Sequence, residues 1–287
     1  MAGMCGGVCM KFAQMICAMS VNIGDDIQSV AAARLLPQVD QYVDRESLNS
    51  VPGPKPVCII MNAWFMAGDG WPPSPFVRPI FVGFHTTPGS QPKIGRHSEY
   101  LRRYEPIGVR DRGTAHYLNS HGISTEVTYC VTLTLPPRNK VPVRGKVVIV
   151  DANDISVPRT LRRGAVRLTH IIPGMNTATK LQYAKELIEF YRENAALVIT
   201  RRLHCALPCI AMGIPTVFFG NPKDTRTMIV SDIGGIIYNK RLYRVPLLSQ
   251  GMIDWSPRPL DISPVRQRLL QTVATRLETV GCTPVSE

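Results

Sequence analysis

The alternation of short apolar runs with helical segments is the feature that most constrains this chain. The apolar runs are bounded by Pro, Gly or charged residues, as strands buried on both faces of a parallel sheet are; they lie at 12–19, 57–61, 80–84 and 107–109. Between the first two runs, Ile27, Val30, Ala31 and Leu35 recur at helical spacing up to Pro37. A short helix over 114–120, closed by a glycine, follows the fourth run. The N-terminal part is therefore predicted to alternate β and α.

A second α/β series follows residues 135–142, whose polar, Pro-rich composition is typical of a linker. It contains predicted strands at 146–151, 196–200 and 216–219, a long helix with Leu181, Ala184, Ile188 and Tyr191 on one face, and further helices at 203–212 and 264–280. The expected fold is thus α/β, with two Rossmann-like doubly wound domains, 1–138 and 139–287, that face a central cleft.

The charge distribution favours an anionic partner. The net charge is +12, and residues 141–287 contain 20 Lys and Arg against 11 Asp and Glu. Such a field attracts a phosphorylated small molecule, a nucleotide-sugar, nucleic acid or an anionic membrane surface. The basic residues are scattered or paired and do not interleave with aromatic residues as a nucleic-acid-binding motif would, so we expect no nucleic-acid partner.

The eight cysteines lack the CxxC pairs of a metal site, and Cys5 and Cys9 have no downstream pair to join. We expect reduced, mostly buried thiols, no metal, no cofactor and a cytoplasmic location. The apolar first 20 residues fall short of a membrane span, and a signal peptide is the weaker alternative to a first strand because a positive n-region is missing. A location peripheral to a membrane stays open, although no amphipathic basic helix supports it.

The loops that follow the predicted strands are the places to look for chemistry, because ligands of such folds bind at the carboxyl ends of strands. The first loop contains Asn22, Gly24, Asp25 and Asp26 at the start of a helix, where oxygen-rich ligands bind, although Asn and Asp are also ordinary helix caps.

The second loop, 108–114, places Arg110 and Arg112 between a buried strand and a helix that starts near Thr114. Arginine binds phosphate and carboxylate oxygens bidentately, so we expect an anion here. Asp111 either orients Arg110 or pairs with Arg112 on the surface.

The third loop, 200–206, places Arg201 and Arg202 beside His204 at another strand-to-helix junction. Together these side chains can hold an anion and move a proton. His85 also ends a strand and either contacts the ligand or holds the following turn. The remaining histidines are predicted to be structural or exposed; they are His97, His116, His121 and His170.

At these loops the chain resembles the polysaccharide pyruvyl transferase family. The matching segments run in the family's order over roughly residues 15–220, and the Arg-Leu-His segment is the most specific of them; they are 22–26, 62–66, 71–74, 81–85, 106–111 and 198–208. One departure is that Thr128-Tyr129-Cys130-Val131 stands where many members have an acidic residue.

The resemblance implies a GT-B-like fold and transfer of the enolpyruvyl unit of phosphoenolpyruvate onto two hydroxyls of a glycan or a lipid-linked sugar, giving a pyruvate ketal. It places Arg110, Arg202 and His204 at the donor, residues 1–138 on the acceptor side and residues 139–287 on the donor side. Arginines suit this donor, which has about three negative charges near neutral pH, and a protonated His204 would supply the proton that its methylene carbon needs.

Two other functions stay open at this point. A GT-B glycosyltransferase that uses a nucleotide-sugar would share the fold, because fold does not fix function. A catalytically silent glycan-binding protein would also keep it. The acceptor sugar and the oligomeric state do not follow from the sequence.

Overall fold

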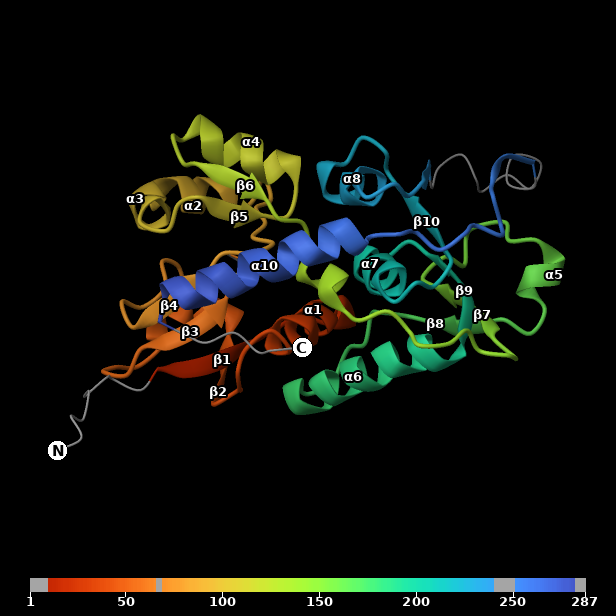
Figure 1. The fold of residues 1–287 in the computed structure, drawn as a ribbon, viewed down its shortest axis with the longest axis horizontal. Helices are drawn as coiled ribbons and strands as arrows, with labels where there is room; N and C mark the ends of the chain where they lie inside the picture. Colours follow the sequence, from red (N-terminus) through yellow and green to blue (C-terminus); the bar gives the residue numbers. More distant parts are fainter. Residues whose placement is uncertain (1–9, 66–68, 240–250, 282–287) are drawn as a thin grey trace.

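A computed structural model describes residues 10–65, 69–239 and 251–281 of the chain. It has the predicted mixed α/β architecture with parallel sheets (Figure 1). Cys5, Cys9 and Cys282 lie outside the described residues, and the five cysteines within them are buried. Among the helices of the described ranges, none combines the length and apolar character needed to cross a membrane.

The first sheet has four parallel strands in the order β2-β1-β3-β4. The strands are β1 (Lys11–Ile16), β2 (Gln41–Asp44), β3 (Val57–Ile60) and β4 (Val77–Ile80). Helix α1 (Ile23–Ala33) connects β1 to β2, and the 3-10 helix η1 (Arg45–Ser50) follows β2. All four residues of β3 are buried, as expected for a strand covered on both faces.

A small two-stranded parallel sheet adjoins the first. It pairs β5 (Ile107–Val109) with β6 (Thr125–Val127) and is accompanied by α2 (Gln91–Arg96), α3 (Ser98–Arg102) and α4 (Arg112–Ser120). The predicted strand at 80–84 is wrong, because β4 ends at Ile80. Gly83 then turns the chain in the left-handed region at φ +73°, and Phe84 pairs with Val109 as an isolated bridge.

The second large sheet has five parallel strands in the order β11-β10-β9-β7-β8. The strands are β7 (Lys146–Val150), β8 (Val166–Leu168), β9 (Ala195–Thr200), β10 (Thr216–Gly220) and β11 (Ile237–Asn239). The helices among them are α5 (Arg159–Arg162), α6 (Thr177–Asn194), α7 (Leu203–Ala211) and α8 (Thr225–Asp232). Asn176 caps α6 by accepting from the Thr179 backbone N–H.

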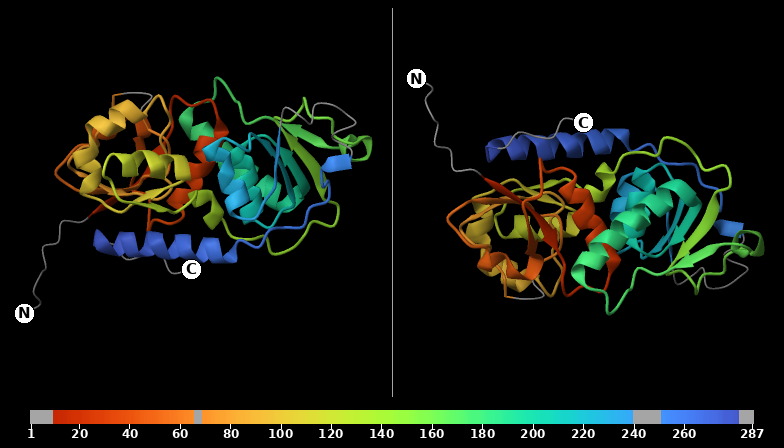
Figure 2. Two further views of the ribbon diagram at one scale, coloured as in Figure 1. Left: turned by 90° about the horizontal axis from the view of Figure 1, so that it is seen from above. Right: turned by 90° about the horizontal axis from the view of Figure 1, so that it is seen from below.

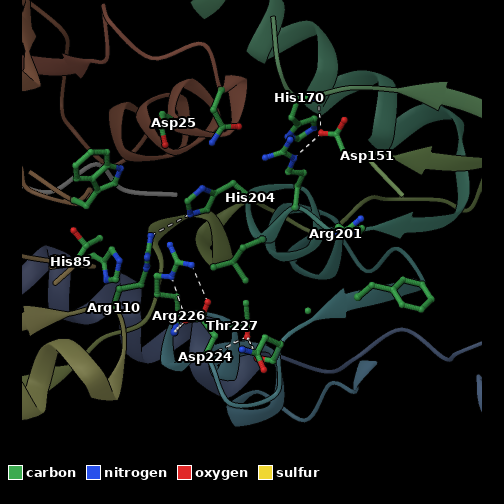
Figure 3. A pocket seen from close by; sticks show the side chains of 18 residues that line it. Asp25, His85, Arg110, Asp151, His170, Arg201, His204, Asp224, Arg226 and Thr227 are labelled. Carbon is green, nitrogen blue, oxygen red and sulfur yellow. Dashed lines mark hydrogen bonds and ion pairs between the residues drawn. The ribbon is translucent and has the colours of Figure 1, made fainter. Parts of the chain in front are cut away.

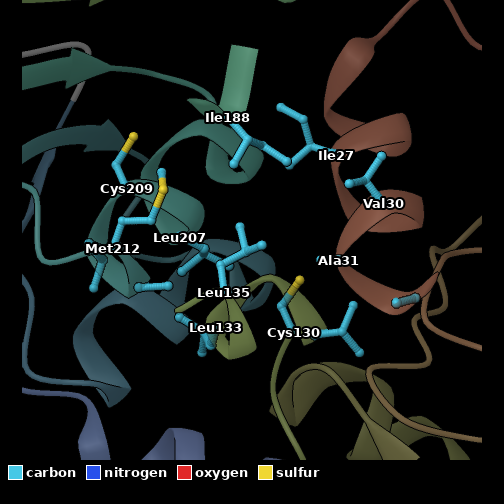
Figure 4. Packing of buried hydrophobic residues seen from close by; sticks show 14 of the residues in the cluster. Ile27, Val30, Ala31, Cys130, Leu133, Leu135, Ile188, Leu207, Cys209 and Met212 are labelled. Atoms are coloured by element: carbon cyan, nitrogen blue, oxygen red, sulfur yellow. The ribbon is translucent and has the colours of Figure 1, made fainter. Parts of the chain in front are cut away.

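A continuous apolar core joins the two large sheets. Helix α1 packs against α6 and α7, and the 3-10 helix η2 (Val131–Thr134) packs against α1 and α7 (Figure 4). Leu135 belongs to this core and Arg138 donates to the Ala195 carbonyl, so the start of the predicted linker is anchored. Because interfaces of this kind resist relative motion, the core fixes the loops of both parts in one arrangement.

The last helix, α10 (Ser263–Thr279), packs against η2 and β4, although the predicted boundary places it with residues 139–287. Figure 2 shows it along the outside of the N-terminal part. Arg276 holds it there by donating to the carbonyls of Phe81 and Pro106 and to the carboxylate of Glu126.

Candidate active site

A cleft of about 660 Å³ lies at the carboxyl ends of strands from both large sheets. Its walls are formed by the loops after β1, β3, β4, β5, β7, β8, β9 and β10, as the general rule for parallel sheets predicts (Figure 3). Within the residues that the structure describes, no group of three or more His, Cys, Asp or Glu is arranged to hold a metal ion.

Arg110 is a buried cation at this cleft, with 4% of its surface exposed. Its Nε has no hydrogen-bond partner among the described residues, and the Asp111 carboxylate lies 3.9 Å from it, beyond hydrogen-bond distance. Burial lowers the pKa of Arg110. A buried guanidinium with unused donors is costly, and an anion in the cleft would offset that cost.

His204 stands at the start of α7 beside this guanidinium. Its Nε2 lies 3.4 Å from Arg110 NH1, and its Nδ1 lies 3.2 Å from Gln28 Nε2 (Figure 3). Because the guanidinium and the amide nitrogen both donate, the imidazole is neutral in this arrangement, and one of its two nitrogens accepts. Burial and then the charge of Arg110 lower the pKa of His204 well below its ordinary value. Helix α1 approaches closely, since a Cβ on Gly24 would lie 2.9 Å from the His204 Cβ.

Arg201 and Arg202 line the cleft but already have carboxylate partners. Arg202 Nε donates to Asp151 at 2.6 Å, and Arg201 NH1 donates to Asp154 at 2.5 Å. Asp151 also accepts the His170 backbone N–H at 3.0 Å. An anion would have to compete with these bonds, so Arg110 is the stronger attractor of the three arginines.

Asp111 orients His85, and it also forms a 3.9 Å ion pair with Arg110, one of the two partners considered from sequence, whereas Arg112 pairs with Asp232. Asp111 Oδ2 accepts from His85 Nδ1 at 2.6 Å, and its Oδ1 accepts the Thr114 backbone N–H at 3.0 Å, which caps α4. His85 Nε2 is therefore the unprotonated nitrogen, and it has no partner among the described residues. Burial and the charge of Arg110 lower the pKa of His85 to about 4.

The remaining predicted residues divide between the cleft and its surroundings. Asn22 caps α1 by accepting from Gly24 N at 3.2 Å and also lines the cleft. Asp26 is fully buried, 3.9 Å from Lys180 Nζ, and Arg112 is exposed and paired with Asp232 at 3.0 Å. Of the twelve predicted site residues, the cleft is lined by Asn22, Asp25, His85, Arg110, Arg201, Arg202 and His204, and not by Gly24, Asp26, Asp111, Arg112 and Thr114.

Several cleft residues were missed from sequence. Trp64 follows β3, Asp151 follows β7, and Asp224 and Arg226 follow β10. His170, expected to be structural or exposed, is buried against the cleft with its Nε2 2.9 Å from the Tyr191 hydroxyl. Applying the strand-end rule to the polar loop after residues 216–219 would have found Arg226.

Arg226 adds a second positive charge near Arg110. Its guanidinium donates to both Asp224 carboxylate oxygens, at 3.2 and 2.8 Å, while 55% of its side chain stays exposed. All three side chains line the cleft, and the charge of Arg226 is one of the causes that lower the pKa of Arg110 and His85. An exposed ion pair of this kind contributes little, so Arg226 is free to exchange partners.

Comparison with known proteins identifies the family. A solved structure of a functionally uncharacterised protein from Klebsiella pneumoniae subsp. pneumoniae NTUH-K2044 is similar at 15% identity and a TM-score of 0.45, covering 78% of this chain and 88% of that one. No curated protein matches the sequence. The sequence model of the polysaccharide pyruvyl transferase family matches residues 22–223, which include the loops of Asn22, Arg110 and His204. The chain therefore belongs to the polysaccharide pyruvyl transferase family.

Proposed function

We propose that this enzyme transfers the enolpyruvyl unit of phosphoenolpyruvate onto two hydroxyls of one sugar in a glycan or a lipid-linked precursor, forming a pyruvate ketal. The observation that supports this donor most directly is the pairing of buried Arg110 with a neutral His204 at 3.4 Å. Arg110 is stabilised by an anion in the cleft, and the neutral His204 can take up a proton when that anion binds.

Phosphoenolpyruvate has both a phosphate and a carboxylate, so it needs more than one cationic group. Arg110 approaches from the loop after β5, and Arg226 approaches from the loop after β10. In this proposal the donor lies between these arginines and therefore contacts both Rossmann-like parts of a GT-B-like fold. The donor site would then be shared between residues 1–138, which were expected on the acceptor side, and residues 139–287, which were expected on the donor side.

The reaction adds one proton to a carbon atom of the donor and removes one proton from each of two sugar hydroxyls. In the first step a sugar hydroxyl oxygen bonds to C2 of the donor, its proton leaves, and C3 receives a proton and becomes a methyl group. In the second step another hydroxyl oxygen bonds to C2, the C2–O bond to phosphate breaks, and phosphate leaves with the electron pair. The second hydroxyl proton leaves with hydrogen phosphate or with solvent, so the atoms balance.

His204 is the proposed proton donor to C3. An anion that draws Arg110 away from Nε2 removes a neighbouring positive charge and adds negative charge, and both changes raise the pKa of His204. The imidazole would then take up a proton on donor binding and deliver it as the hydroxyl attacks. The reaction requires no redox step.

The test is a donor comparison with the purified protein. It is mixed with phosphoenolpyruvate and a panel of methyl pyranosides, and released phosphate is measured; parallel reactions contain nucleotide-sugars, and released nucleoside diphosphate is measured. We expect phosphate release that depends on one class of sugar. Release of nucleoside diphosphate without phosphate would instead identify a glycosyltransferase.

A further inference from the structure

The cleft has a cationic floor, formed by Arg110 and Arg226, and the wall opposite Arg226 differs from it in chemistry. In Figure 3, Asp25 lies on the other side of His204 from Arg226. Asp25 shares this wall with Trp64, which is only partly buried. A carboxylate repels a donor with three negative charges, whereas carboxylates and aromatic rings together suit the hydroxyls and the apolar C–H face of a neutral sugar.

A buried arginine fixes both side chains from behind. The guanidinium carbon of Arg45 lies 4.8 Å from the centre of the Trp64 ring, and NH1 lies 3.8 Å from Asp25 Oδ2. Arg45 is 4% exposed and donates from Nε to Glu46 at 2.6 Å. Because the arginine packs against the indole and is itself buried, the ring is held in place where Trp64 lines the cleft.

The backbone around Trp64 is fixed as well. Trp64 pairs with His85 in an isolated parallel bridge, and His85 N donates to the Ala63 carbonyl at 3.1 Å. On the preceding side, Asn62 donates to the Gln28 carbonyl at 3.3 Å. The aromatic ring is thus preorganised before any ligand binds, which lowers the cost of binding.

Asp25 has spare acceptor capacity close to the reacting group. Its carboxylate accepts from Ser20 Oγ at 2.6 Å and from Gln28 Nε2 at 3.4 Å, which leaves lone pairs for a ligand hydroxyl. The same Gln28 nitrogen lies 3.2 Å from His204 Nδ1. One side chain therefore separates Asp25 from the proposed proton donor.

We propose that Trp64 and Asp25 form the subsite for a neutral pyranose acceptor, whose ring stacks on the indole while a hydroxyl donates to the carboxylate. Arg45 is the positioning residue for both. This inference rests on the proposed function, since it names the second substrate of the same cleft. The acceptor would bind at the wall formed by Trp64 and Asp25, and the donor would bind at the cationic floor.

The test separates the two substrates kinetically in Trp64→Leu and Trp64→Phe. Loss of the aromatic face in Trp64→Leu should raise the KM for the active methyl pyranoside by about tenfold, the scale of a lost aromatic contact, with the KM for phosphoenolpyruvate nearly unchanged. Trp64→Phe keeps a smaller ring and should lie between. Trp71→Phe is the matched control, because Trp71 is a buried tryptophan of the same part that does not line the cleft.

A second readout does not require turnover. Saturation-transfer NMR with the same methyl pyranosides, without donor, should show the ring protons of at least one sugar contacting the wild-type protein, and this signal should disappear in Trp64→Leu but not in Trp71→Phe. An unchanged sugar KM and signal in Trp64→Leu, or a rise in the donor KM alone, would overturn the subsite. Sugar contact that depends on Trp64 without any phosphate release would keep the subsite and reject the proposed reaction.

Discussion

Replacement of Arg110 with methionine should make the ligand-free protein more stable while it weakens donor binding. Arg110 is buried, its Nε has no hydrogen-bond partner among the described residues, and its ion pair with the Asp111 carboxylate is 3.9 Å long. Methionine keeps an unbranched apolar side chain and removes the charge. The Asp111 carboxylate keeps hydrogen-bond partners in this variant, because its bonds to His85 and Thr114 remain.

The expected magnitudes follow from these contacts. Replacing a whole buried ion pair with apolar residues is often neutral or stabilises a protein by about 1–4 kcal/mol, whereas removing one partner of a close pair leaves the other charge buried and uncompensated. Arg110→Met falls between these cases, because Asp111 lies 3.9 Å from Nε without a hydrogen bond and keeps its bonds to His85 and Thr114, so we expect a gain of about 1 kcal/mol. Loss of charge-assisted hydrogen bonds should cost about 1.5–3 kcal/mol of binding, which is roughly ten- to hundredfold in affinity for phosphoenolpyruvate.

Urea unfolding without ligand and calorimetric titration with phosphoenolpyruvate measure the two effects. Arg112→Met is the matched control, because this neighbouring arginine is exposed, pairs with Asp232 and does not line the cleft. It should change both quantities by less than about 0.5 kcal/mol. A destabilised Arg110→Met variant with unchanged donor affinity would show that Arg110 is a structural residue and refute the reasoning.

Three further results are expected. His204→Gln should lower turnover by about 10²- to 10⁴-fold with a small change in donor affinity, and titrations in buffers of different ionisation enthalpy should show that it abolishes proton uptake on donor binding. Burial raises the pKa of Asp26 to about 6, so the folded state binds this proton more tightly than the unfolded state. Relative to Asp26→Asn, the wild type should therefore be most stable at low pH and lose stability as pH rises through about 6 in urea unfolding; a pH-independent difference would contradict this. Arg226→Met should raise the donor KM without changing the unfolding midpoint, because its exposed pair with Asp224 contributes little.

The parts of the site that sequence could predict are those set by local pattern. A buried strand that ends in a polar residue before a helix is visible in a single segment, and Arg110, His204 and Asn22, named from such segments, line the cleft. The partners of these residues are set by contacts between distant segments. The Asp111–His85 bond spans 26 positions and the Arg202–Asp151 bond spans 51, and no local periodicity encodes either pairing.

The fold shows the same division between local and distant information. The strands around 57–61, 107–109 and 146–151 were recognised because each is a continuous apolar run. The return of α10 to the N-terminal part depends on Arg276 reaching the carbonyls of Phe81 and Pro106, 195 and 170 positions away. An amphipathic stripe predicts that such a helix packs, but not which surface it covers.

The most direct test of the central claim is to run the reaction in D₂O and observe the sugar product by NMR. If this enzyme forms a pyruvate ketal with a proton delivered to C3, the product methyl group will contain one deuterium from solvent, and phosphate will be released in equal amount. His204→Gln should form this product far more slowly. Consumption of phosphoenolpyruvate without a deuterated ketal methyl, or an active sugar that gains no ketal, would contradict the assignment of Arg110 and His204 as the donor site.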